Sequence, residues 1–422
     1  MNDLARRIQR VYLTLQLGNT LAASFIWGIN TLFLLDAGLS NLEAFAANAF
    51  FTAGMVLFEV PTGVVADVWG RRVSYLLGTL TLAGSTFLYW LLWAANAPFW
   101  PWAIVSALLG LGFTFFSGAV EAWLVDALHF AAYDGSLEAV MGRGQMVGGA
   151  AMLGGSVLGG VVAQASNLGV PFLLRVGVLL AMFFVAARLM KDLGFTPGQG
   201  ERPLQEVRKL FGATVEYGLR NRPVRWVMLS QPFASGVSIY TFYALQPYLL
   251  GLWGDSKDYS IAGLAAAIVA GAQIVGGYLA PLFRQLFGKR TTALILANVA
   301  TVSILAAIGL THSFWIALVL LTFWAMVFAA ESPIRQAYLN DMIPSRQRAT
   351  VLSFDSLMGS SGGVVIQPAL GKVADAYSYS TSIVVGGIIQ LAAAPFLLAS
   401  RRERAAADTA TTMAAPLPAD PV

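Results

Sequence analysis

The sequence predicts an all-α polytopic membrane protein with twelve transmembrane helices in two pseudo-symmetric six-helix bundles. Three observations support this prediction: the composition, a series of apolar stretches, and the distribution of basic residues. Hydrophobic residues make up 57% of the 422-residue chain and charged residues only 11%, whereas soluble domains carry about 25% charged residues. The 42 glycines also fit membrane helices, which pack closely through small residues.

Each apolar stretch is long enough to cross a hydrocarbon core about 30 Å thick, which takes about 20 residues in a helix. The expected spans are 11–36, 42–66, 73–95, 99–126, 140–165, 169–190, 224–250, 259–284, 290–310, 313–335, 350–373 and 379–400.

The longest polar interruption divides these spans into two groups of six. We therefore expect an N-terminal bundle over 1–190, a cytoplasmic linker over 191–223, a C-terminal bundle over 224–400 and a disordered cytoplasmic tail over 401–422. Low hydrophobicity with many Ala, Thr and Pro is typical of a disordered segment.

The two groups of spans resemble each other in sequence. Gly70-Arg71-Arg72 after span 2 corresponds to Gly288-Lys289-Arg290 after span 8, and Glu121 in span 4 corresponds to Glu331 in span 10. Internal repeats of this kind are typical of alternating-access transporters, in which the substrate site lies between the repeats.

Basic residues set the expected orientation. With the N-terminus in the cytoplasm, all of the 26 Lys and Arg except Arg175, Lys257 and Lys372 fall on the cytoplasmic side, as the positive-inside rule requires. Both termini are then cytoplasmic, and the plasma (inner) membrane of a bacterium is the expected location. The net charge of +4 reflects this topology, so we expect no nucleic-acid partner.

The residue inventory excludes several kinds of site. The chain has no Cys, and its two His, His129 and His312, lie far apart in sequence, so we expect no metal site. No phosphate-binding loop or nucleophile motif occurs. We expect no enzyme activity and no cofactor, and any uphill transport must use an ion gradient.

One charged segment stands between spans 2 and 3. It has the spacing G-x-x-x-D-x-x-G-R-R and consists of Gly63, Asp67, Gly70, Arg71 and Arg72 with their intervening residues. The glycines favour a tight turn, and Asp67 can interact with the dipole of a neighbouring helix N-terminus.

This spacing resembles the loop between helices 2 and 3 of the major facilitator superfamily of secondary transporters. The resemblance implies the major facilitator fold, transport by alternating access, and a cytoplasmic gate that an acid at the end of helix 4 completes. Asp126 stands at that position here, whereas Val68 replaces a residue that is usually basic. The segments Glu121–Asp126 and Pro333–Asn340 are similar to the drug-exporter-like branch of the superfamily.

Three acids within the spans are candidates for proton coupling or substrate binding: Glu59, Glu121 and Glu331. Intramembrane acids are costly and are functional candidates by default. Glu331 has Arg335 four residues on, which suits an ion pair on one helix face or a joint substrate site. Glu121 has no such neighbour and suits a proton carrier. Glu59 serves either coupling or the structure of the gate.

Polar side chains at helical spacing predict a wet interior. The expected cavity-lining residues are Gln16, Asn19, Trp27, Asn30, Thr52, Gln231, Ser235, Ser238 and Gln246. The alternative is interhelical hydrogen bonding without a cavity. The glycine-rich span 5 resembles an antiporter motif only loosely, and close helix packing explains it equally well. Arg175 is expected to reach the outer interface, with anion binding as the alternative.

Together these patterns predict proton-coupled export of small amphipathic molecules by alternating access. The alternatives are uptake of a small solute or anion, at Arg175 or Arg335, and lipid translocation on the same scaffold. The expected partners are a small-molecule substrate, protons and membrane lipids, and we expect a monomer.

Overall fold

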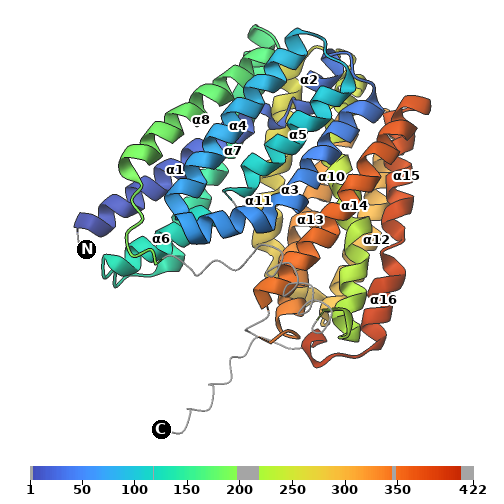
Figure 1. Cartoon of the computed structure of the whole chain (residues 1–422). Helices are drawn as coiled ribbons and strands as arrows, with labels where there is room; N and C mark the ends of the chain where they lie inside the picture. The colour runs from blue at the N-terminus through green and yellow to red at the C-terminus, as the bar shows by residue number, and fades with distance from the viewer. Residues whose placement is uncertain (1–2, 117, 197–217, 345–347, 410–422) are drawn as a thin grey trace.

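The computed structural model describes residues 3–116, 118–196, 218–344 and 348–409, and this part of the chain is helical with no strand (Figure 1). The helices are α1 (Asp3–Trp27), α2 (Asn30–Asp36), α3 (Asn41–Trp69), α4 (Arg71–Ala94), α5 (Phe99–Thr114), α6 (Ala119–Phe130), α7 (Leu137–Ala165), α8 (Gly169–Leu189), α10 (Arg222–Trp253), α11 (Tyr259–Leu286), α12 (Arg290–Leu310), α13 (Phe314–Asn340), α14 (Arg348–Ala376), α15 (Tyr379–Leu391) and α16 (Ala394–Arg402), followed by the short 3-10 helix η3 (Ala406–Asp408).

Every expected span has a helical counterpart in this part of the chain. Nine helical segments there are long and apolar enough to cross a membrane, and α1 with α2 makes a tenth if the pair, bent by 47°, counts as one span. The helices α10 and α14 occupy the expected spans 7 and 11. They are long but less apolar, because each carries polar side chains that face the protein interior.

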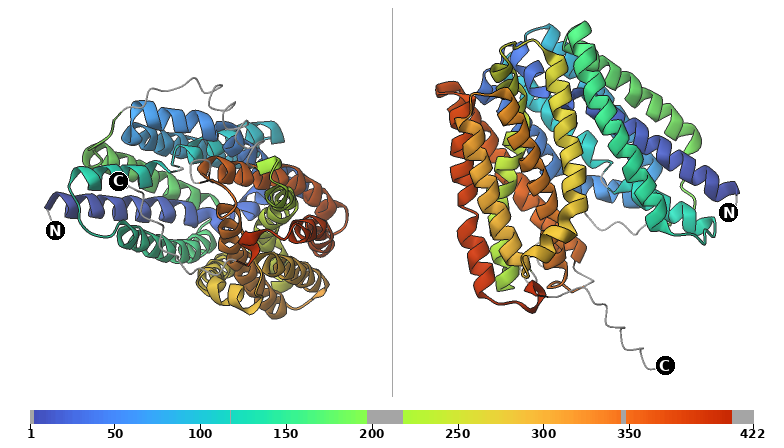
Figure 2. Two further views of the ribbon diagram at one scale, coloured as in Figure 1. Left: turned by 90° about the horizontal axis from the view of Figure 1, so that it is seen from below. Right: turned by 180° about the vertical axis from the view of Figure 1, so that it is seen from behind.

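The helices form two bundles. The first contains α1 to α8, with contacts such as α1 to α7, α3 to α5 and α4 to α8, and the second contains α10 to α16. The bundles contact each other through α3 with α14 and through α7 with α11. Figures 1 and 2 show that the bundles meet at one end and diverge toward the end where the N-terminus lies.

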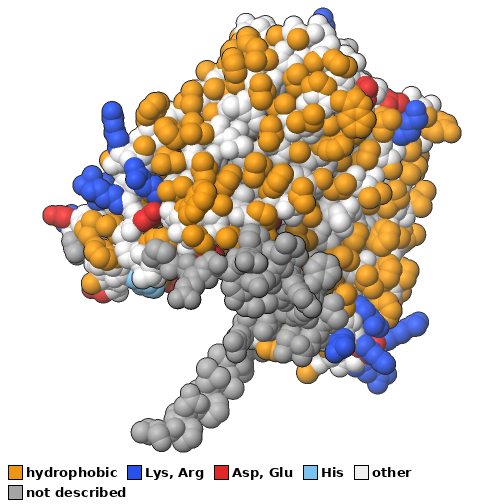
Figure 3. Space-filling model, in the orientation of Figure 1, with side chains coloured by type: hydrophobic (Ala, Val, Ile, Leu, Met, Phe, Trp, Pro, Cys, Tyr) orange, Lys and Arg blue, Asp and Glu red, His pale blue; other side chains and the backbone are white. Residues whose placement is uncertain are grey.

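The surface fits a membrane environment. Figure 3 shows hydrophobic side chains across the broad middle of the molecule, while most of the visible Lys and Arg gather near the lower ends of the two bundles. Large apolar side chains such as Leu57, Trp100 and Ile316 are more than half exposed. Exposed apolar side chains over so much of the surface are stable only against lipid.

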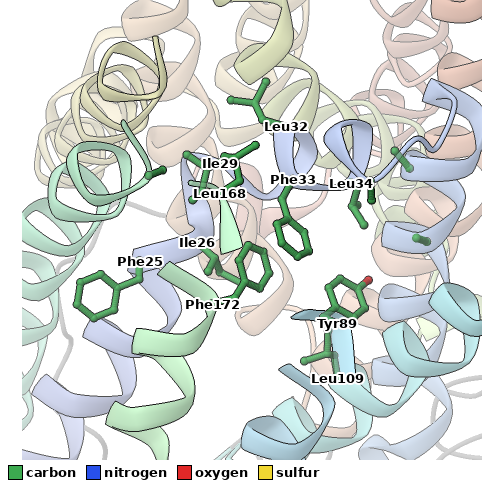
Figure 4. Close-up of a cluster of buried hydrophobic side chains, with 14 of the residues drawn as sticks. Phe25, Ile26, Ile29, Leu32, Phe33, Leu34, Tyr89, Leu109, Leu168 and Phe172 are labelled. Carbon is green, nitrogen blue, oxygen red and sulfur yellow. The ribbon is translucent and has the colours of Figure 1, made fainter. Parts of the chain in front are cut away.

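An aromatic cluster consolidates the first bundle near the end where the bundles meet. Figure 4 shows Phe33 of α2 beside Phe172 of α8 and Tyr89 of α4. The ring centroids of Phe33 and Phe172 are 3.7 Å apart, and Trp102 of α5 packs edge-on against both Phe33 and Tyr89. These contacts fix the bent segment α2 against three longer helices.

The glycines of the expected span 5 serve close helix packing. A Cβ on Gly160 of α7 would lie 2.5 Å from the carbonyl oxygen of Tyr259 and 2.9 Å from the Cα of Gly263 on α11. Only glycine permits this approach of two backbones. The α7–α11 contact between the bundles therefore depends on this pair of glycines.

The expected domain borders fall partly outside the described residues. Residues 197–217 of the expected linker (191–223) and residues 410–422 of the expected tail are outside the described residues. The expectation of disorder from residue 401 is wrong for the first nine residues, because α16 ends at Arg402 and η3 follows. Asp408 is almost completely buried, so this segment is part of the folded C-terminal bundle.

Candidate functional site: a central cavity between a closed end and a charged end

Gln246 of α10 forms hydrogen bonds between the two bundles at the end away from the N-terminus. Its Nε2 donates to the carbonyl oxygen of Trp27 at 2.6 Å, and its Oε1 accepts from the backbone N–H of Thr31 at 2.9 Å. The hydroxyl of Thr31 also donates to the carbonyl oxygen of Tyr243 at 2.9 Å. Gln246 and Thr31 are buried, so these bonds are shielded from competing water.

Further bonds between the bundles lie at the same end. The carboxylate of Asp375, near the end of α14, accepts from the backbone N–H groups of Asn41 and Leu42 at 2.9 and 2.8 Å. It thereby satisfies two donors at the start of α3 that have no partner within the helix. The backbone N–H of Tyr259 donates to Gln164 at 2.7 Å. The closed end thus combines polar bonds with the glycine contact of α7 and α11.

A cavity of about 360 Å³ lies next to this closed end, within the N-terminal bundle. This volume falls in the range of small-molecule sites. Most of the lining is apolar, with Leu82, Phe113, Phe116 and Leu179 among the residues that contribute. The polar and aromatic lining residues are Gln16, Asn19, Thr20, Trp27, Glu121 and Arg175.

Glu121 accepts a hydrogen bond from a neutral amide on another helix. Gln16 Nε2 donates to Glu121 Oε1 at 3.1 Å and lies 3.3 Å from the hydroxyl of Tyr12. The partner comes from α1, 105 residues away in sequence. Its amide does not neutralise the carboxylate, and no salt bridge joins Glu121 to a basic residue in the described part of the chain.

Asn19 is held in the cavity wall by α4. The hydroxyl of Tyr75 donates to Asn19 Oδ1 at 2.6 Å, and Asn19 lines the cavity. Tyr75 is completely buried, so the orientation of Asn19 is fixed by packing.

Arg175 also lines this cavity, which corrects the expectation that it reaches the outer interface. The residue is only 9% exposed because α8 packs against both α1 and α4, and this face of the helix points inward. Its Nε has no hydrogen-bond partner. The phenols of Tyr89 and Tyr243 are its electrostatic neighbours.

Arg335 forms its salt bridge with Asp355 and not with Glu331, so the ion-pair alternative for Glu331 and Arg335 is wrong. Arg335 Nε and Nη2 donate to the two carboxylate oxygens of Asp355 at 3.1 and 2.5 Å, and Nη2 also donates to the carbonyl oxygen of Val227 at 2.9 Å. Both side chains are buried. Asp355 was missed, although an acid inside the expected span 350–373 is itself a signal.

Glu331 instead borders a smaller pocket in the C-terminal bundle. This pocket has a volume of about 90 Å³, and its lining includes Gln231, Ser235 and Ser238 of α10. These three expected cavity residues therefore face a separate space from the one that Gln16, Asn19 and Trp27 line.

The remaining expected cavity residues belong to the closed end or to helix contacts. Asn30 Nδ2 donates to Asn48 Oδ1 at 3.0 Å, and the hydroxyl of Thr52 lies 3.4 Å from Gln367 Nε2 of α14. Gln246 joins the bundles, as described above. For Asn30 and Thr52 the alternative of interhelical hydrogen bonding is therefore correct, whereas Gln246 also lines a small pocket with Trp27 and Phe242. Glu59 is half-buried on α3, and the lining of the main cavity does not include it.

The charged motif is more compact than its sequence implied. Helix α3 continues to Trp69, so Gly63 is helical and the expected turn from Gly63 onward is wrong. Gly70 alone, with φ of 102°, connects α3 to α4. Asp67 and Arg71 form an ion pair of 2.6 Å across this junction.

Asp192, in the segment after α8, takes the place expected for Asp126. Asp192 Oδ1 accepts from the backbone N–H of Arg72 at 2.9 Å, and the Arg72 guanidinium donates to the carbonyl oxygen of Ala187 at 2.5 Å. Asp126 forms no ion pair with Arg71 or Arg72 in the described residues. Burial raises the pKa of Asp192, although its bond to Arg72 and the charges of Arg72 and Arg71 act against this rise.

The second copy of the motif has a matching arrangement. Asp408, after α16, accepts from the backbone N–H and the hydroxyl of Thr291 at 2.7 and 2.8 Å. Arg290 pairs with Asp341 at 2.6 Å and also donates to the carbonyl oxygen of Ala407. In each bundle, an acid that follows the last membrane span thus caps the start of the third span: Asp192 after α8 caps α4, and Asp408 after α16 caps α12. The signal in the sequence was an acid shortly after spans 6 and 12.

This chain is similar to known proteins over most of its length. The family model of the Major Facilitator Superfamily matches residues 12–284 and 232–421. An uncharacterized MFS-type transporter of Methanocaldococcus jannaschii is 22% identical over 410 residues, covering 93% of this chain and 99% of the relative. The uncharacterized MFS-type transporter YxaM of Bacillus subtilis is 22% identical over 370 residues, covering 85% of this chain and 88% of the relative.

Solved structures share the fold at low identity. The nucleoside transporter NupG superposes with a TM-score of 0.77 at 12% identity, covering 95% of this chain and all of NupG. A bacterial homologue of the human lysosomal transporter Spinster, in an inward-facing and unoccupied conformation, has a TM-score of 0.71 at 17% identity, covering 95% and 98%. A D-xylose-proton symporter has a TM-score of 0.65 at 17% identity, covering 93% and 96%.

The helical bundles, the paired motifs and the family model that matches both halves agree: the chain belongs to the Major Facilitator Superfamily and is a polytopic membrane transporter.

Proposed function

We propose that this chain is a proton-coupled secondary transporter that exports small amphipathic molecules from the cytoplasm by alternating access. The observation that carries the proposal is the largely apolar cavity of about 360 Å³ with Glu121 in its wall. Apolar side chains with a few placed polar groups are typical of sites for small organic ligands. The similarity of two segments to the drug-exporter-like branch supports the outward direction.

The bonds at the closed end suit alternating access. The end that carries most Lys and Arg is cytoplasmic by the positive-inside rule, so the end fastened by Gln246 and Asp375 faces outward. The bundles then diverge toward the cytoplasm (Figures 1 and 2). Access from outside requires these bonds to break and the two bundles to rotate relative to each other.

Glu121 suits the role of proton carrier. Its carboxylate borders the cavity and meets the neutral amide of Gln16. The carboxylate forms no salt bridge among the described residues, so it is free to take up a proton when the cavity changes access. In the proposed cycle Glu121 gains a proton from outside and releases it inside, and the substrate leaves in the opposite direction.

The same proposal covers the oligomeric state, the membrane location and the cytoplasmic gate of the protein. The protein works as a monomer in the inner membrane of a bacterium, with both termini in the cytoplasm and lipid around the apolar surface. Asp67, Arg71, Arg72 and Asp192 form the cytoplasmic gate network. No step requires a cofactor or metal.

Arg175 favours a second candidate function, the uptake of an anion. A buried guanidinium in the same cavity supplies the positive charge that such a substrate needs. Uptake and export use the same cavity and differ in which gradient drives the cycle.

Proteoliposomes loaded with a pH-sensitive dye test the coupling. An imposed pH gradient, with ethidium, 1-naphthylmethanol and 1-naphthalenesulfonate as probes, should drive flux of at least one probe against its own gradient in the wild type. Glu121→Gln should abolish this driven flux while leaving exchange of the probe across the membrane intact. Glu331→Gln, in the separate pocket, is the matched control and should keep driven flux. Full pH-driven flux in the Glu121→Gln variant refutes the assignment.

A further inference from the structure

The proposed proton coupling gives no role to Arg175, although this residue lines the same cavity as Glu121. It lies on α8, its side chain is more than nine-tenths buried, and it shares the cavity wall with Gln16, Asn19, Trp27 and Glu121. Its Nε is buried without a hydrogen-bond partner. A guanidinium has five N–H donors and stays protonated in proteins, so this charge needs a counterpart.

Arg175 has no salt-bridge partner among the described residues, although Glu121 lines the same cavity. Its electrostatic neighbours are the phenols of Tyr89 and Tyr243. Arg335, by contrast, is buried to a similar degree and is neutralised by both oxygens of Asp355. Burying an unpaired charge is costly, so an unpaired guanidinium in a cavity wall is the pattern of a site that a ligand completes.

We propose that Arg175 binds the carboxylate of a small amphipathic organic anion. Such anions are then the substrates of the cavity of about 360 Å³ in the N-terminal bundle. This inference rests on the proposed transport function and deepens it. Arginine and carboxylate match as a bidentate pair, and Asn19 lines the same cavity. Trp27, Phe113 and Phe116 supply apolar area for the body of the molecule.

The charge balance of the cavity selects a monoanion. Its wall carries one guanidinium and one carboxyl group, on Arg175 and Glu121. A substrate with a single negative charge neutralises Arg175, while a doubly charged phosphate would meet only one cation and would face Glu121 as well. The predominantly apolar lining also excludes small, fully hydrated anions, which have no surface to bury there.

Calorimetric titration of the purified full-length protein in detergent tests this assignment. The probes are 1-naphthoate and its neutral analogue 1-naphthamide, which share a ring system and differ in charge. The wild type should bind the carboxylate at least about tenfold more tightly than the amide, which corresponds to about 1.4 kcal/mol. Arg175→Gln should lose this preference and still bind the amide with the wild-type affinity, which also shows that the variant is folded.

The matched control is Arg188→Gln, which removes one exposed positive charge from the same helix and should keep the preference. Arg175→Lys retains the positive charge but lacks the planar guanidinium that can bind a carboxylate through two N–H groups. This variant should keep only part of the preference for the carboxylate probe. Equal affinity for the two probes in the wild type overturns the inference, as does an unchanged preference in Arg175→Gln. Binding needs no pH gradient, so a carboxylate preference without driven flux refutes the transport proposal alone, and driven flux without the preference refutes this inference alone.

Discussion

The carboxylate of Asp192 lies where a side chain on Gly70 would have to be. A Cβ on Gly70 would stand 2.4 Å from Asp192 Oδ2, while Oδ1 of the same carboxylate accepts the backbone N–H of Arg72 at 2.9 Å. Gly70 also has φ of 102°, a conformation that other residues rarely adopt. The junction of α3 and α4 therefore depends on glycine for two separate reasons.

Gly70→Ala should destabilise the protein for both reasons. The strained backbone alone costs about 1–3 kcal/mol, and displacement of Asp192 adds to this loss. The measurement is the unfolding free energy, or the midpoint of thermal unfolding, in detergent. Gly84→Ala is the control, because a Cβ at this helical glycine meets no atom within 4 Å. Similar stability of the two variants would contradict the prediction.

The raised pKa of Asp192 predicts how stability at this junction depends on pH. Its folded pKa lies above the ordinary value, so the folded protein holds this proton more firmly than the unfolded chain does. The contribution of Asp192 to stability is therefore present below about pH 4, the ordinary range of an Asp carboxyl, and is lost as pH rises through the folded pKa.

Asp192→Asn isolates this titration, because Asn keeps an oxygen that accepts the Arg72 N–H. Between pH 4 and pH 7 the wild type should lose stability relative to the variant, and the difference should level off once Asp192 is ionised. Thermal unfolding across this pH range measures the difference. Parallel curves for the two proteins would show that the carboxyl does not titrate abnormally.

The buried pair of Arg335 and Asp355 should be strongly coupled. Removal of either partner leaves an isolated buried charge, which costs about 3–5 kcal/mol, so Arg335→Gln and Asp355→Asn should each reduce stability severely. The double variant should be more stable than the sum of the single losses implies. Denaturation of the four proteins gives the coupling energy. Glu331→Gln is the control, since Glu331 forms no salt bridge with Arg335 in the described residues.

Asp375→Ala should shift the transporter away from the state described here. The variant loses the acceptor for two N–H groups of α3, and these bonds exist only while the closed end is closed. A single cysteine placed at Asn19, in a chain that has no native Cys, should react more slowly with a membrane-impermeant reagent added from the cytoplasmic side.

Asp258→Ala is the matched control for this experiment. Asp258 caps α11 by accepting the backbone N–H of Ile261 within one bundle, so its loss removes a helix cap without removing a bond between bundles. Equal labelling rates in the two variants would show that the Asp375 bonds do not hold the end closed.

Local patterns predicted much of the architecture. The apolar stretches have helical counterparts over the whole described chain, because span length and hydropathy depend only on neighbouring residues. The spacing from Gly63 to Arg72 identified the family, which the match of the family model confirms. The sequence also identified Gln16, Asn19, Trp27 and Glu121 as polar groups that should face a cavity, since polar side chains in lipid must turn inward.

The partners of buried polar groups depended on tertiary structure. Gln16 meets Glu121 across 105 residues, and Arg335 meets Asp355 in place of the nearer Glu331. Helical spacing shows which residues share a face of one helix, but it does not show which other helix that face contacts. The partner therefore follows only from the packing of the bundle.

Arg175 shows most clearly that the sequence of one helix does not determine what its side chains contact. The apolar sequence around it on α8 determined by itself that the segment would span the membrane, because hydropathy is a sum over residues. Such a segment is apolar on nearly every side, so its sequence left the direction of Arg175 open, toward lipid headgroups or toward the interior. Packing of α8 against α1 and α4 decided this direction and placed an unpaired guanidinium in the wall of the cavity.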